Sequence, residues 1–297
     1  MSDAGDDAVG TRRMLAPTTA RLRRIHIDQV HRPPWPDFAA FDPSAWPLAL
    51  RQAAAVQWAG RARAEHGSVQ QFTQLAHALT HACAPLELHG ALARLVTDEV
   101  RHAELCAQMA LVCDPQGERE RAAWLRWPPP QEPWSPPPPP GADPAAIFAW
   151  AAGAIAIACC LGETLSRPML DAIATVATCP IAEAVARQIG RDEHLHAAFG
   201  WDALATLLPQ LDDAGRNHVE ASLARGLGAL EHTTCCGIPL AEVAGQQLEI
   251  VRTDVPNLGT LTDLQYAMIF YATVEGEIMP KLEALGLPAA RLWSERG

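Results

Sequence analysis

The sequence predicts an all-α protein built on a bundle of four long helices, with a long crossover between the second and third helices and two additional C-terminal helices. Two observations predict this fold class. Four segments rich in alanine and leucine carry apolar residues at alternating spacings of three and four, a pattern typical of helices that pack nearly parallel to one another. A proline-rich break separates the second segment from the third and provides the long connection.

The first 45 residues lack a sustained periodicity. They are charged and then proline-rich, so we expect a mobile start followed by an extended strap that lies on the helical body. The first bundle helix is expected from about residue 46 to residue 83, because Ser44 is a suitable N-cap and Pro47 fits a first helical turn. Its apolar stripe contains a single charge, Glu65.

The second helix begins near Pro85 and is followed by a crossover over residues 114–144. Ten prolines between Pro128 and Pro144 make the crossover stiff and extended. The later helices are expected at 145–178 with a bend at Pro168, at 180–208, at 212–231 and at 261–285. The predicted single helical domain covers 46–297, with the bundle at 46–113 and 145–209 and the C-terminal helices within 210–297.

Two copies of the motif Asp-Glu-x-x-His-Ala lie on the second and fourth predicted helices. Residues three apart lie on one face of an α-helix, about one turn from each other. Glu99 and His102 can therefore bind one metal ion together, as can Glu193 and His196. The competing interpretation is that these are exposed pairs in ordinary contact, but both pairs fall on the apolar stripe of their helix.

Each motif helix is preceded by a helix with one inward-facing glutamate, Glu65 on the first helix and Glu163 on the third. Four carboxylates in an apolar seam would repel one another and would be costly to desolvate. Two divalent cations would balance the four negative charges. Oxygen ligands with one imidazole per metal favour iron, with manganese next. Zinc is less suitable, because it prefers four ligands that often include thiolate.

Residues beside the six candidate ligands are predicted to support them. Asp98 and Asp192 adjoin the motif glutamates, and metal-bound histidines commonly donate their other N–H to such groups. Ser68 and Ser166 lie one turn beyond the other two glutamates and are candidates for the same role.

Four residues on the ligand stripes are candidates for lining a pocket beside the metals. Ala62 and Gly200 are small and would leave room there. Cys106 and Cys160 lie about one turn from ligands, and for them simple packing as small apolar residues is the favoured alternative.

The pattern resembles the ferritin-like di-iron carboxylate superfamily, whose members bind two irons through a glutamate from each of two helices and a Glu-x-x-His from each of the other two. The resemblance covers residues 46–209. It implies that Glu99 and Glu193 bridge the two irons (Fe²⁺/Fe³⁺) and that the complete ligand set is Glu65, Glu99, His102, Glu163, Glu193 and His196.

The resemblance implies an O2-dependent oxidoreductase, and we expect an oxygenase or oxidase that acts on a small organic substrate and receives electrons from a donor. The chain is longer than four helices require, so its extra segments can enclose a substrate. The alternative is iron handling by a ferroxidase, an iron-storage protein or a rubrerythrin-like peroxide scavenger, since some ferritins share these ligands. A purely structural or binding role is the third alternative, and the intact ligand set speaks against it.

Two branches of the superfamily fit less well. The N-oxygenase branch has an additional histidine ligand, whereas Ile189 stands four residues before Glu193. A radical-generating subunit needs a tyrosine beside the iron, but Tyr266 and Tyr271 both fall in the last predicted helix.

Composition restricts the partners. A formal net charge of −11 argues against nucleic acid and against an anionic membrane surface. The longest apolar stretch, from Ala145 to Leu161, is interpreted as a buried core helix and not as a membrane span. Eight cysteines in a large aliphatic chain without a signal peptide indicate reduced thiols and a cytoplasmic protein. A homodimer is compatible with the sequence.

Overall fold

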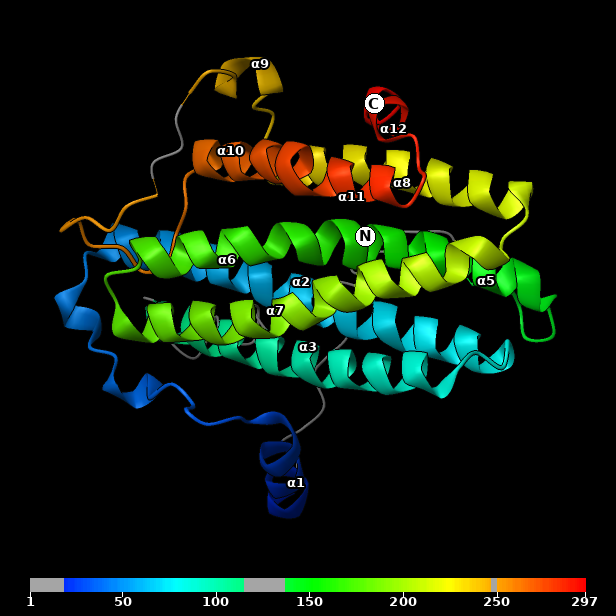
Figure 1. Ribbon diagram of the computed structural model, residues 1–297. Coiled ribbons are helices and arrows are strands. Elements are labelled where there is room, and N and C mark those ends of the chain that lie inside the picture. Colours follow the sequence, from blue (N-terminus) through cyan, green and yellow to red (C-terminus); the bar gives the residue numbers. More distant parts are fainter. Residues whose placement is uncertain (1–18, 115–136, 247–249) are drawn as a thin grey trace, which may run out of the picture.

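The computed structural model describes residues 19–114, 137–246 and 250–297, and over these residues the protein is all-helical, without a strand (Figure 1). The all-α prediction is therefore confirmed. Most of the predicted crossover and the start of the predicted strap lie outside the described residues. The helices that follow the N-terminal segment are α2 (Leu48–His81), α3 (Leu86–Cys113), α5 (Pro144–Ile155), α6 (Thr164–Val176), α7 (Pro180–Leu207), α8 (Asp213–Thr234), α9 (Leu240–Val243), α10 (Asp263–Thr273), α11 (Met279–Ala284) and α12 (Ala289–Ser294).

Four long helical stretches pack side by side and position the candidate ligands. α2 lies along α3, α6 lies along α7, and α3 and α7 also contact each other (Figure 1). Their shared interior is apolar, and Trp58, Leu92, Ile155 and Leu204 are all completely buried. The predicted boundaries of these helices agree with the observed ones to within about two residues, because long apolar stripes are strong local signals.

The third long stretch is not a uniform α-helix. A π-helical segment, η3 (Ala156–Glu163), separates α5 from α6, so the irregularity ends at Glu163, while Pro168 lies inside α6. The segment packs against α7. At this contact Gly200 faces Cys159 so closely that a Cβ on the glycine would lie 2.4 Å from the cysteine Cβ. The missing side chain at residue 200 therefore allows the two helices to approach.

The stretch Pro144–Val176 is long and apolar enough to span a membrane by length and composition, and 67% of its most apolar window is buried inside the protein. It is covered by the C-terminal helices. α8 packs on α5, and α10 packs on α6, along one side of the molecule (Figure 1). A second π-helical segment, η5 (Val274–Ile278), joins α10 to α11.

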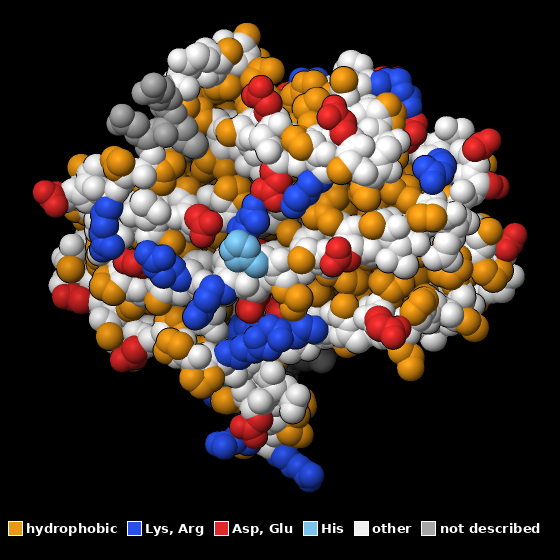
Figure 2. Space-filling model, in the orientation of Figure 1, with side chains coloured by type: hydrophobic (Ala, Val, Ile, Leu, Met, Phe, Trp, Pro, Cys, Tyr) orange, Lys and Arg blue, Asp and Glu red, His pale blue; other side chains and the backbone are white. Residues whose placement is uncertain are grey.

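The N-terminal segment differs from the predicted extended strap, because Ala20–Val30 forms a helix, α1. Thr19 caps this helix by accepting a hydrogen bond from the Leu22 amide. Val30 is its only buried residue, while Leu22 and Ile25 are exposed, so α1 makes little apolar contact with the body. The helix lies against α3, on the side of the molecule away from α10 (Figure 1), and Figure 2 shows it projecting from the body. Two short 3-10 turns follow, η1 (Phe38–Ala40) and η2 (Pro43–Ala45).

Candidate metal centre

The two Glu-x-x-His motifs meet in the interior between α3 and α7. Glu99, His102, Glu193 and His196 are buried, and one ligand atom of each lies within 4.8 Å of those of the others. Nδ1 of His196 is 3.0 Å from Glu99 Oε1 and 3.3 Å from Glu193 Oε2. This group could hold a metal ion.

The other two candidate glutamates reach the same place from the remaining long helices. Glu65 Oε2 on α2 lies 3.6 Å from Nδ1 of His102, and Glu163 Oε2 at the end of η3 lies 4.0 Å from Nδ1 of His196. The structure thus brings all six predicted residues together. The side chains of Glu65 and Glu163 are 13% and 10% exposed, against 1% for Glu99, so the centre is most open on their side.

Polar atoms at the centre lack the partners that buried groups normally have. Both carboxylate oxygens of Glu99 and of Glu193, and Nδ1 of both histidines, are buried without a hydrogen bond. Native proteins satisfy nearly all such groups, and each unsatisfied one costs about 1–3 kcal/mol or more when charged. These unpartnered oxygens and nitrogens are the kind of donor set that a cation requires, so the residues present could hold a bound metal ion.

The histidines are held in a crossed arrangement. Nε2 of His102 on α3 lies 3.3 Å from Asp192 Oδ2 on α7, and Nε2 of His196 on α7 lies 3.5 Å from Asp98 Oδ2 on α3. Each aspartate therefore faces the histidine of the other motif. Because Nε2 faces the carboxylate, Nδ1 is the atom that each ring presents to the centre.

A layer of arginines behind the aspartates was not predicted. The fully buried guanidinium of Arg101 contacts Asp98, lies 3.1 Å from Asp192, and donates to the Val30 carbonyl at 3.2 Å. Arg94 Nε donates to Asp98 at 2.6 Å. The available signal was the spacing, since Arg94 and Arg101 stand four residues before and three residues after Asp98 on one helix.

The pKa values report the crowding of like charges. Burial and the negative charge of Glu163 raise the pKa of Glu99 to about 8. Burial and the charge of Glu193 raise the pKa of Glu163 well above its usual value. Burial alone would lower the pKa of His102, but its contacts with Asp192 and Glu65 outweigh burial and raise that pKa to about 10. Protons therefore partly offset the charge of the metal-free centre.

The pKa values of Asp98 and Asp192 are lowered, in contrast to those of the two glutamates. Burial would raise the pKa of Asp98, but His196 and Arg94 outweigh burial and lower it to about 2. The pKa of Asp192 is also lowered, because its interaction with His102 outweighs burial. Both carboxylates are thus ionised near neutral pH, so Asp192 can accept from Nε2 of His102 and a negative Asp98 faces Nε2 of His196 at 3.5 Å.

The remaining predicted residues have other contacts. The Ser68 hydroxyl donates to the Ala64 carbonyl of its own helix at 3.5 Å, and Ser166 makes no hydrogen bond to a candidate ligand in the described part of the chain. Neither serine is seen in the predicted supporting role.

Of the four candidate pocket residues, Ala62, Cys106 and Cys160 are buried, which agrees with packing. Burial raises the pKa of both thiols well above the usual value, so they are neutral. For Gly200 the expectation of free space was wrong, because Cys159 occupies that space.

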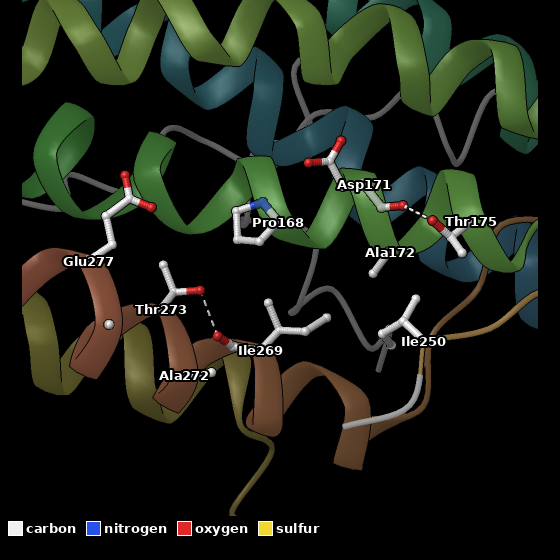
Figure 3. A pocket seen from close by; sticks show the side chains of 10 residues that line it. Pro168, Asp171, Ala172, Thr175, Ile250, Ile269, Ala272, Thr273 and Glu277 are labelled. Carbon is white, nitrogen blue, oxygen red and sulfur yellow. Dashed lines mark hydrogen bonds between the residues drawn. The ribbon is translucent and has the colours of Figure 1, made fainter. Parts of the chain in front are cut away.

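A cavity of about 520 Å³ lies elsewhere, between α6 and α10 (Figure 3). Its wall includes Pro168 and Thr175 of α6 and Ile269 of α10, and Glu277 of η5 lies at its edge. Glu277 contacts Arg167 and lies 2.7 Å from Lys281 Nζ. None of the six candidate ligands lines this cavity.

No family model matches this chain, and searches of curated proteins and of solved structures gave no match.

Proposed function

We propose that this chain is a non-haem di-iron oxygenase or oxidase, built on a ferritin-like four-helix bundle, that uses O2 to oxidise a small organic substrate. The proposed ligands are the six residues that meet at the centre, Glu65, Glu99, His102, Glu163, Glu193 and His196. The observation that carries the proposal is the set of buried carboxylate oxygens and imidazole nitrogens without hydrogen-bond partners.

The donor chemistry favours iron over zinc. Four carboxylates and two imidazoles form an oxygen-rich set, which suits iron and then manganese. The nearby thiols of Cys106 and Cys159 carry pKa values raised by burial, so they supply no thiolate for a soft metal. Two bound Fe²⁺ ions would supply the electrons for the reduction of O2 and, through it, the oxidising power for the substrate.

The chain's own residues have three roles in this proposal. Asp98 and Asp192 fix the imidazole rings so that Nδ1 faces the centre. Arg101 compensates the charge of both aspartates. The burial of the histidine side of the centre excludes water there, which leaves the side of Glu65 and Glu163 for O2 and substrate.

The proposal includes an external electron donor, because a centre that reduces O2 repeatedly has to be reduced again.

The C-terminal helices, which pack on α5 and α6, account for chain length beyond the four long helices. In an oxygenase such additional helices can help to enclose a substrate.

The decisive experiment loads the metal-free protein with Fe²⁺ without oxygen, exposes it to O2, and follows visible absorption and O2 consumption with and without a mixture of candidate metabolites. We expect about two irons per chain, a small native mass, and O2 consumption that depends on substrate. Iron loading far beyond two per chain in a large shell would replace the proposal by iron storage. Substrate-independent consumption of peroxide would replace it by peroxide scavenging.

A further inference from the structure

We propose that His26, His31 and Glu104 form a second metal site that binds one divalent transition-metal ion, zinc being the best fit, and fastens the N-terminal helix to α3. The three residues come from α1, from the residue after α1 and from α3. None of them belongs to the candidate centre between the long helices.

Both histidine rings of the proposed site point at the same carboxylate oxygen of Glu104. Nε2 of His26 lies 2.8 Å from Oε2 of Glu104, and Nε2 of His31 lies 2.9 Å from the same oxygen. Without an ion, both imidazoles must carry their proton on Nε2 to bond this oxygen. Ligand atoms around a tetrahedral zinc lie about 3.3 Å apart. An ion therefore requires each histidine nitrogen to move only about 0.5 Å farther from the carboxylate oxygen, and the three ligand atoms already lie within 4.8 Å of one another.

The ring of His31 is held in place by a neighbour. It stacks on Trp35, with ring centroids 3.7 Å apart and planes within 6° of parallel. Such a contact fixes the direction of Nε2 before any ion arrives, which reduces the ordering cost of binding. The His26 ring approaches the His31 ring edge-on, at 80°.

The site is also accessible to solvent and offers three protein ligands, as zinc sites with a free fourth coordination position do. The side chains of His26, His31 and Glu104 are 38%, 21% and 28% exposed, so an ion and a water molecule can reach them. Two imidazoles and one carboxylate are a known ligand set for zinc, with the fourth position left to water. The set carries one negative charge when both imidazoles are neutral, which favours a divalent cation.

The position of the site explains what an ion would do for the fold. α1 projects from the body (Figure 2), and Val30 is its only buried residue. Apart from the contacts of the two histidines with Glu104, a hydrogen bond from Arg101 to the Val30 carbonyl also joins α1 to α3. An ion shared by α1 and α3 would therefore stabilise a junction that little apolar contact supports.

The test is zinc stoichiometry after equilibration with Zn²⁺ and removal of free ion, measured by elemental analysis. Zn²⁺ can also occupy the main centre, so a Glu99→Gln/Glu193→Gln background isolates the second site. In that background we expect about one Zn²⁺ per chain, lost with His26→Ala/His31→Ala. The matched control is His77→Ala/His81→Ala, which removes another pair of histidines whose rings are in contact, 4.7 Å apart, and should leave the zinc count unchanged.

The fastening role has its own readout. Trypsin can cut α1 at Arg21, Arg23 and Arg24, which are exposed. We expect Zn²⁺ to slow this cleavage at least several-fold in the natural sequence and to have no effect in His26→Ala/His31→Ala. Equal zinc counts with and without the two histidines would overturn the site, and zinc binding without protection of α1 would overturn the fastening role.

Discussion

Nε2 of His102 on α3 lies 3.3 Å from the carboxylate of Asp192 on α7, so each motif supplies the support for a histidine of the other. The reverse pair, His196 and Asp98, lies at 3.5 Å. Neither helix can rotate or slide without disturbing both rings. The orientation of the candidate ligands is thus a property of the contact between the two helices.

Replacing Asp192 by Asn should weaken metal binding without removing it. The amide can no longer accept from Nε2 of His102 as a charged partner, so we expect the affinity for Fe²⁺ or Mn²⁺ to fall about 10–100-fold while the stoichiometry stays the same. Competition with a chelator measures the affinity. The control is Asp143→Asn, which changes an exposed helix cap far from the centre, and an equal loss in both variants would contradict the supporting role of Asp192.

Glu99→Gln and Glu193→Gln should each reduce the iron content from about two per chain to about one or fewer, because each removes a central carboxylate. Glu87→Gln, an exposed change in the first turn of α3, is the matched control. Iron content is read by elemental analysis after anaerobic loading. Unchanged content in both central variants would refute the ligand assignment.

Replacing Arg101 by Met should destabilise the protein by about 3–5 kcal/mol, since Asp98 and Asp192 would lose their buried counter-charge. Urea unfolding measures the loss. Adding Asp98→Asn to the variant should recover part of it, because it removes one of the two charges that Arg101 no longer faces, leaving Arg94 to pair with Asp192. The control, Arg21→Met on the exposed part of α1, should stay within about 0.5 kcal/mol of the natural protein.

Gly200→Ala should cost about 1–3 kcal/mol of stability, because its Cβ would lie 2.4 Å from Cys159 Cβ and α7 would have to move away from η3. Gly162→Ala offers a comparison in the contacting π-helical segment. Its Cβ would meet the Ile157 carbonyl at an ordinary 3.5 Å, so this change should be neutral or slightly stabilising. Thermal unfolding separates the two, and equal effects would mean that the contact at Gly200 is not tight.

The metal-free protein should lose stability as pH rises. The pKa of Glu99 is raised from 4.5 to about 8, so the folded state holds a proton that the unfolded state has released over this window. The pKa of His102 is raised from 6.5 to about 10, and its contribution is lost through the same rise in pH. Asp98, with a pKa lowered to about 2, acts in the opposite direction only in strong acid.

Urea unfolding of the metal-free protein at about pH 6 and about pH 9 checks this dependence, with lower stability expected at the higher pH. Bound divalent cations hold the deprotonated forms and should abolish or reverse the difference. In Glu99→Gln the part of the slope that belongs to Glu99 should disappear. Stability that rises with pH in the metal-free protein would contradict the assignment of these pKa shifts.

The long helices and the six ligand candidates were predictable because they depend on local periodicity. A helix places residues three apart on one face whatever it packs against, so Glu99 and His102 share a face from spacing alone. Other features left no such trace. α1 buries a single residue, and the π-helical segment η3 contacts Gly200 of a helix that follows in the sequence.

The sequence by itself therefore determined the all-helical class, the apolar stripes and the polar residues that interrupt them. Only the tertiary structure decided which aspartate faces which histidine, that Arg101 compensates both aspartates, and that His26 and His31 meet on Glu104. The physical reason is the difference in sequence separation between the interacting residues. Helix periodicity is fixed within a few residues, whereas these contacts join side chains from different helices, whose rotation and separation are set by the packing of the whole core.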